Sequence, residues 1–186
     1  MAKKLFWKNQ MASEDVNSYL VSGRFYNDED VPAEIHDGAI VVIGDLEDHA
    51  LYDGIKDLNV RKITAPAAET DAIAIVDIVN VSEGDIKGVV YREGIKTTDM
   101  TQVAGVPVRV RIVKKIDSFN IGSGNIDGEP VVGEYLIPQA GSTLLAPSAT
   151  KVEGVTCFKI EAKLPLTEGV IDTDVKYLCT AVSVVE

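Results

Sequence analysis

Short runs of apolar residues, separated by clusters of turn-forming residues, occupy most of the chain after residue 35. The runs lie at 38–44, 58–63, 71–81, 88–92, 106–112, 131–137, 142–145, 158–164 and 177–185. Runs of this length bounded by Gly, Pro, Asn and Asp predict β-strands. Their spacing of roughly ten residues predicts a mainly β protein, folded as an antiparallel β-sandwich or barrel-like domain with little helix.

Two of these runs have patterns that predict how they are buried. The run 71–81 is nearly all apolar, which is typical of a central strand buried on both faces. The run 106–112 alternates apolar residues with Pro107, Arg109 and Arg111, which predicts a strand with one buried face. We expect the arginines, with Lys114 and Lys115, to decorate the solvated face of that strand.

Residues 1–35 have a different pattern, because aromatic residues are scattered among Asn, Asp, Glu and Ser. We interpret this segment as an irregular N-terminal arm with at most a short helix from Ser13, preceding a β-rich body at 36–186 that divides into two subdomains near 115–130. The arm packs either on the body of its own chain or on a neighbouring subunit. Its large side chains are the candidate contact residues: Phe6, Trp7, Met11, Tyr19, Phe25 and Tyr26.

Composition supports the β assignment and excludes some partners. The chain has 25 Val and 17 Ile against 11 Leu, and β-branched residues fit a pleated sheet. Its net charge of −11 argues against a nucleic-acid partner, because phosphates need a basic surface. No run is long enough to span a membrane, and no signal peptide is predicted at the start. The two cysteines, Cys157 and Cys179, are expected to be buried and reduced rather than ligands of zinc.

Three polar stretches are candidate ligand sites, and each is better interpreted as a loop. The stretch 120–128 is rich in glycine, but Glu129 and Pro130 follow it where a phosphate-binding loop needs a helix, so we expect a long hairpin loop. His36 and His49 lie among acidic residues without the spacing of a known metal motif. The acids at 28–30 and 45–53 leave a weak calcium site open, although they lack the pattern of an EF-hand.

No motif for catalysis emerges. A Gly-x-Ser-x-Gly elbow is absent from the sequence, and a Cys–His pair would require a buried cysteine to reach the histidine loops. A pair of carboxylates acting as in glycosidases stays open as a minor alternative, since 29 acids are present. We therefore expect a non-enzymatic protein that needs no cofactor.

The order of the segments after residue 37 resembles that of small capsid-associated structural proteins of tailed bacteriophages, of the decoration (cement) or head-fibre class. The resemblance is carried by Asp37–Gly44, Tyr52–Gly54, Val60–Pro66, Gly105–Arg109, Asp117–Ile121, Val132–Leu136, Gly141–Leu145 and Phe158–Ala162. It implies a β-rich protein without enzymatic activity that binds the major capsid protein on the outer surface of the virion, often as a homotrimer, after assembly in the host cytoplasm.

Two alternatives remain. A tail-tube or baseplate subunit would also be a phage structural protein. A surface-displayed β-sandwich that binds a ligand or calcium belongs to a different class, and the missing signal peptide counts against it. An acidic chain suits capsid decoration best, because such a chain stays soluble at high copy number and does not adhere to nucleic acid.

Overall fold

The structure is a computed structural model, and it describes residues 4–15, 17–48, 56–78, 101–165 and 175–186. It confirms the predicted fold class, because the described chain is mainly β with several antiparallel pairings and very little helix. The helical turns are α1 (Ala12–Asp15), η1 (Asn17–Tyr19) and η2 (Ser123–Asn125). The strands are β1 (Phe6–Gln10), β2 (Leu20–Phe25), β3 (Ile35–His36), β4 (Ile40–Asp48), β5 (Lys56–Thr64), β6 (Ala74–Asp77), β7 (Thr101–Gln102), β8 (Val108–Ile112), β9 (Ser118–Gly122), β10 (Tyr135–Pro138), β11 (Leu145–Ser148), β12 (Cys157–Pro165) and β13 (Val175–Ser183).

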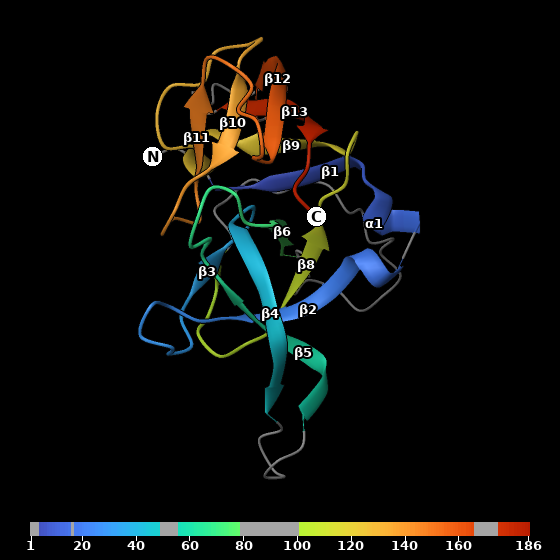
Figure 1. The fold of residues 1–186 in the computed structure, drawn as a ribbon, viewed down its shortest axis with the longest axis vertical. Coiled ribbons are helices and arrows are strands. Elements are labelled where there is room, and N and C mark those ends of the chain that lie inside the picture. The colour runs from blue at the N-terminus through green and yellow to red at the C-terminus, as the bar shows by residue number, and fades with distance from the viewer. Residues whose placement is uncertain (1–3, 16, 49–55, 79–100, 166–174) are drawn as a thin grey trace, which may run out of the picture.

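The strands form two principal units, which lie one above the other in Figure 1. The lower unit is a closed barrel with the strand order β2-β5-β4-β6-β8, in which β2 pairs parallel to β5 and antiparallel to β8. The upper unit is a six-stranded antiparallel sheet with the order β1-β9-β13-β12-β10-β11. A small two-stranded sheet, β3-β7, accompanies them.

Strand β2 closes the barrel by pairing with β5 and β8, and it packs closely against the interior at Gly23. A Cβ atom built on Gly23 would lie only 2.7 Å from Cγ2 of Ile63, so a larger residue would displace the core side chains there. The barrel interior contains Val108 and Val110 of β8 together with apolar residues of β4, β5 and β6. The apolar stretch that predicted a buried central strand contributes β6, and all four residues of β6 are buried.

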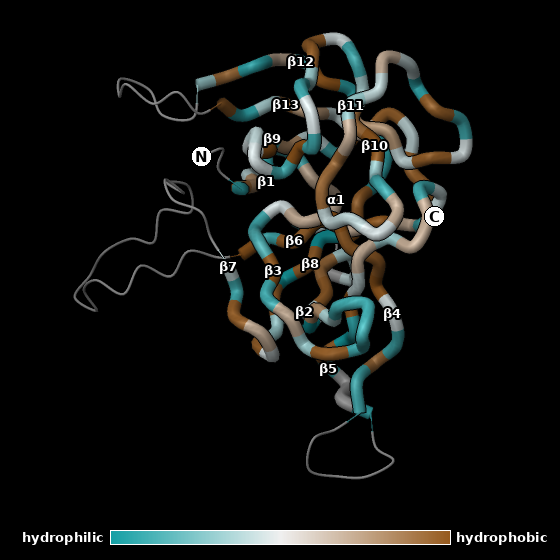
Figure 2. Tube along the Cα trace, turned by 90° about the vertical axis from the view of Figure 1, so that its left-hand side faces the viewer, coloured by the Kyte–Doolittle hydropathy of each residue, from teal (hydrophilic) through white to brown (hydrophobic). Residues whose placement is uncertain are grey.

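The six-stranded sheet buries one face, and its strands alternate accordingly. Along β12, buried and more exposed positions alternate over much of the strand, and Figure 2 shows brown and teal segments following one another there. Phe6, Phe119 and Phe158 are fully buried in this core. The ring of Phe119 lies between the other two, with centroid distances of 5.5 Å to Phe6 and 5.1 Å to Phe158. Ile40, Ile73 and Ile75 of the barrel unit belong to the same core cluster. The two units therefore share an apolar interface.

The N-terminal segment departs from the irregular arm expected for residues 1–35. Strand β1 pairs with β9 at the edge of the sheet, and β2 is one of the five barrel strands. The apolar pattern does not predict β1, because the polar residues Lys8, Asn9 and Gln10 make up most of this strand. The segment thus contributes one strand to each unit and connects them. It is therefore not an irregular arm outside the β-rich body.

The chain leaves the barrel at Ile112 and enters the sheet at Ser118, while the division of residues 36–186 into two subdomains near 115–130 stays a prediction. The stretch expected as a hairpin loop at 120–128 begins inside β9 and continues through η2, so the first part of it is strand. The predicted strand at 88–92 lies outside the described residues.

Candidate functional site

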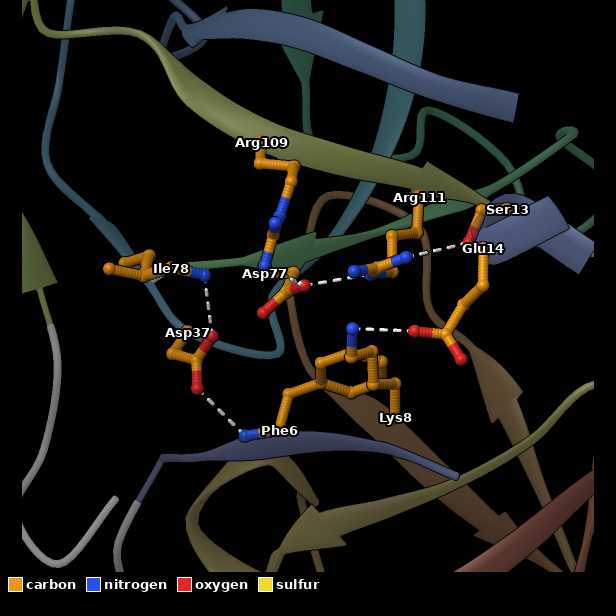
Figure 3. Close-up of polar contacts among 9 residues, drawn as sticks. All are labelled: Phe6, Lys8, Ser13, Glu14, Asp37, Asp77, Ile78, Arg109 and Arg111. Atoms are coloured by element: carbon orange, nitrogen blue, oxygen red, sulfur yellow. Dashed lines mark hydrogen bonds and ion pairs between the residues drawn. The ribbon is translucent and has the colours of Figure 1, made fainter. Parts of the chain in front are cut away.

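A cluster of buried charges lies where the barrel meets the sheet (Figure 3). Asp77 ends β6, and its Oδ2 atom accepts hydrogen bonds from Nη2 of Arg109 and from Nε of Arg111, each at 2.7 Å. The Asp77 and Arg111 side chains are only 6% and 3% exposed. A charge buried this deeply requires a partner of opposite sign, because desolvation would otherwise cost several kcal/mol.

The N-terminal segment completes this cluster from the other side. Nη1 of Arg111 donates to Oγ of the buried Ser13 at 2.9 Å, and Lys8 forms an ion pair with Glu14. The cluster contains three cations, Lys8, Arg109 and Arg111, and three anions, Glu14, Asp77 and the nearby Asp37. The formal charges of these six side chains therefore sum to zero.

Asp37 joins the barrel directly to the edge of the sheet. Its Oδ2 accepts the backbone N–H of Phe6 in β1, and its Oδ1 accepts the backbone N–H of Ile78, both at 2.8 Å. Beside it, Gly38 has a φ of +74°, and Nδ2 of the buried Asn125 donates to the carbonyl of Leu5 at 3.0 Å. We call this set of residues, together with the charged cluster above, the junction: Leu5, Phe6, Lys8, Ser13, Glu14, Asp37, Gly38, Asp77, Ile78, Arg109, Arg111 and Asn125.

The chemistry of the junction is that of a structural clamp. The Ser13 oxygen faces the guanidinium of Arg111, whereas a nucleophilic serine needs a base beside it. The Asp77 carboxylate is shared by two arginines, which favours its ionised form over a proton-donating one. Both groups therefore serve to hold the barrel and the sheet together.

The burial of Arg111 corrects the sequence expectation. The alternation along 106–112 predicts Arg111 on a solvated face with Arg109, but the residue is 2% exposed, because the N-terminal segment around Ser13 covers that face of β8. Asp77 supplied the missing signal. A carboxylate inside a nearly continuous apolar run needs a cationic partner on a neighbouring strand, and β8 offers two.

A second polar cluster lies on the barrel. Arg24 of β2 forms an ion pair with Glu47 of β4, and Nε of Arg24 donates to the carbonyl of Gly105 at 2.8 Å. Glu47 is 3% exposed. Burial, followed by the hydrogen bond with Glu47, raises the pKa of Tyr26 above its usual value. The Tyr26 hydroxyl thus stays protonated at neutral pH and acts as a hydrogen-bonding group.

The six predicted contact residues fall into two groups. Phe6 and Met11 are buried in the shared core, and the partly buried Phe25 packs against the barrel core, so none of these three is presented as a docking side chain. Trp7, Tyr19 and Tyr26 are half-buried. A lysine ammonium lies over each of these three rings. The distances from Nζ to the ring centroid are 5.1 Å for Lys176 over Trp7, 5.0 Å for Lys114 over Tyr19 and 4.6 Å for Lys62 over Tyr26.

Neither the two cysteines nor His36 belongs to a ligand cluster among the described residues. Cys157 and Cys179 are both buried with free thiols, as expected, and burial raises the pKa of the Cys179 thiol. Nδ1 of His36 lies 2.9 Å from Oγ1 of Thr101. His49 and Asp53 lie outside the described residues. Within the described ranges, the structure contains no group of three or more His, Cys, Asp or Glu side chains placed to hold a metal ion.

Asp30, one of the acids considered for calcium, instead pairs with a cation. Its two carboxylate oxygens accept hydrogen bonds from Nζ of Lys62 at 2.8 Å and 3.0 Å. Oδ1 of Asn27 closes the same loop by accepting the backbone N–H groups of Glu29 and Val31. These partners occupy the oxygen atoms of Asp30 and Asn27 that a calcium ion would use.

Among the described residues, no helix is both long and apolar enough to cross a membrane. No family model, curated protein or solved structure matches this chain.

Proposed function

We propose that the protein is a non-enzymatic structural protein that binds the outer capsid of a tailed bacteriophage and decorates or stabilises it. The phage assignment rests on the resemblance carried by residues 37–186. The single structural observation that supports a binding role is the distribution of side chains. Buried charged side chains have partners within the chain, in the junction and at Glu47 and Asp117, whereas large apolar side chains are exposed at Val31, Val103, Val106, Ile116, Val131 and Val132.

Such a surface suits protein recognition better than catalysis. Exposed aliphatic groups and half-buried aromatic rings supply contact area at an interface. The aromatic rings of Trp7 and Tyr26 lie in different units, on β1 and directly after β2. A capsid surface that binds both rings would therefore contact both units.

The test is binding of the purified protein to capsids that lack it, measured by co-sedimentation. Deleting residues 1–35 is unsuitable, because the deletion would remove β1 and β2. Point substitutions avoid this problem. Trp7→Ala and Tyr26→Ala should each weaken binding by about tenfold, as loss of an aromatic interface anchor does.

Tyr135→Ala is the matched control, because Tyr135 is also a half-buried tyrosine but lies on β10, outside the predicted contact set. Circular dichroism confirms that each variant is folded. Failure of the wild-type protein to bind capsids would overturn the proposal. Assembly of the pure protein into rings or filaments in negative-stain images would favour a tail-tube subunit instead.

A further inference from the structure

Two loops next to the barrel expose apolar side chains to solvent. The first joins β2 to β3, and the second joins β7 to β8 and consists of five exposed residues, Val-Ala-Gly-Val-Pro at 103–107. Val31, Val103 and Val106 are 49%, 58% and 43% exposed, and they are three of the six large apolar side chains exposed in the described part of the chain. We call the exposed apolar residues of the two loops the valine patch: Val31, Pro32, Val103, Ala104, Val106 and Pro107.

Strand pairing brings the two loops together. Strand β3 pairs with β7 through Ile35 and Gln102, and β2 pairs with β8 through Gly23 and Val108. Both loops therefore leave their antiparallel ladders at the same end, and Figure 1 shows them together at the lower left, in blue and yellow-green. A side chain also ties them, because Nε of Arg24, on the strand leading into the first loop, donates to a carbonyl of the second at 2.8 Å.

Hydrogen bonds stabilise the conformation of each loop. Oδ1 of Asn27 accepts the backbone N–H groups of Glu29 and Val31 at 3.1 Å and 3.0 Å, and the carbonyl of Val31 accepts the N–H of Asn27 at 3.0 Å. In the second loop, the N–H of Val106 donates to the carbonyl of Val103 at 3.3 Å. A surface that is already ordered loses less conformational entropy when it binds a partner.

The surroundings of the valine patch are acidic. Residues 26–34 contain four acids and no cation, and residues 103–107 are uncharged. Asp30 is paired with Lys62, but Asp28, Glu29 and Glu34 are exposed and form no ion pair with the described residues. Three carboxylates are therefore available to a partner at this surface.

No basic side chain of the four adjoining strands, all of which are described, is available to neutralise these carboxylates. Each has a partner elsewhere: Arg24 pairs with Glu47, Arg109 and Arg111 with Asp77, and His36 with Thr101. The valine patch thus combines exposed aliphatic groups with uncompensated negative charge.

This combination selects the chemistry of the partner. Contiguous exposed apolar groups mark protein interaction sites, and a partner of opposite charge is favoured over one of like charge. We propose that the valine patch binds the outer capsid surface at a site where basic side chains surround apolar ones. The inference rests on the function proposed above and assigns its contact next to the barrel, beginning directly after the candidate contact residue Tyr26.

The test is co-sedimentation with capsids that lack the protein, from about 50 mM to about 500 mM salt. Wild-type binding should weaken as salt rises, because salt screens the attraction between opposite charges. Val106→Asn should weaken binding about tenfold at every salt concentration, since it removes an apolar contact. Glu34→Lys should weaken binding about tenfold at low salt and reduce the salt dependence, since it reverses a charge at the rim of the interface.

Val131→Asn and Glu153→Lys are the matched controls, because they make the same changes at an exposed valine and an exposed acid of other loops. Each control should bind within about twofold of the wild type, and circular dichroism confirms that all four variants are folded. Wild-type protein that does not bind capsids would overturn both the proposed function and this inference.

Other outcomes would overturn this inference alone while the proposed function stands. These are wild-type binding with either Val106→Asn or Glu34→Lys binding as tightly, or wild-type binding that salt does not weaken. Self-association of the pure protein that Val106→Asn abolishes would also overturn it, because the occupant of the valine patch would then be a second copy of the chain.

Discussion

The carboxylate of Asp37 accepts the backbone N–H of Phe6 at 2.8 Å and thereby attaches the edge strand of the sheet to the barrel. An edge strand normally exposes unpaired backbone groups, which makes it a template for aggregation. Here one such group is satisfied by a buried side chain that binds the backbone of Ile78 with its other oxygen.

Asp37→Asn should lower the free energy of unfolding by about 1–3 kcal/mol, because an amide keeps one acceptor oxygen and places an NH₂ group against a backbone donor. Denaturant titration followed by circular dichroism measures this cost. Asp71→Asn is the control, since a single oxygen of Asp71 accepts both backbone N–H groups, from Ala67 and Ala68. Equal costs for the two substitutions would contradict the assigned role of Asp37.

Gly38→Ala should be strongly destabilising for two reasons. Its φ of +74° is unfavourable for alanine, and a Cβ would lie 2.6 Å from Nδ2 of Asn125 and 3.2 Å from Cβ of Phe6. Gly141→Ala separates these causes, because Gly141 has a φ of +71° and nothing within 4 Å of a built Cβ. We expect about 1 kcal/mol for Gly141→Ala, from the backbone term alone.

Gly38→Ala should cost about 2–3 kcal/mol more than its control, since the clash forces apart the side chains that join the units. The difference between the two midpoints in denaturant measures the packing contribution. Similar midpoints would mean that the junction is looser than the contacts at Gly38 indicate.

Asp77→Asn should destabilise the protein by about 3–5 kcal/mol, because it leaves the buried guanidinium of Arg111 facing a neutral amide. Thermal unfolding of the two proteins provides the comparison. Asp48→Asn is the matched control, since Asp48 also pairs with a cation, Lys56, but both side chains are exposed. Its midpoint should remain within error of the wild type, as expected of a surface ion pair.

Stability should fall in alkaline solution because of Cys179. Burial raises the pKa of this thiol above its usual 9.0, so the unfolded chain releases the proton at a lower pH than the folded one. The thiol's contribution is complete below its unfolded pKa and is lost as the pH rises towards the folded pKa. Between about pH 8 and pH 10 the loss should be about 1 kcal/mol.

Cys179→Ala should remove this part of the pH dependence, which denaturant titrations at the two pH values can detect. Native Cys179 should also resist alkylation at neutral pH, since the thiolate is the reactive form. A pH dependence identical in the wild type and Cys179→Ala would exclude Cys179 as its source.

The apolar pattern predicted the strands that bury a continuous face. Strands β4, β5, β6, β8, β12 and β13 each overlap a run of alternating or continuous apolar residues. Strands β1 and β2 were missed because they are stabilised by pairing with distant strands rather than by a pattern of their own. Pairing of this kind depends on where the chain returns, which local periodicity does not encode.

The junction could not be predicted from the sequence, for a related reason. The burial of Arg111 depends on the packing of Ser13 against the outside of β8, and the two residues are 98 positions apart. The charge of Asp77, in the middle of the apolar run 71–81, indicates that a partner is needed. Only the fold identifies Arg109 and Arg111 as that partner.

The placement of β1 also has a consequence during synthesis on the ribosome. Its residue Asn9 contacts Asn120, 111 positions later, so at 5–20 residues per second β1 waits roughly 6–20 s for its partner strand to be translated. A strand that has been translated but is still unpaired can aggregate unless it is polar. Lys8, Asn9 and Gln10, the residues that hid β1 from the apolar pattern, keep it soluble until β9 arrives.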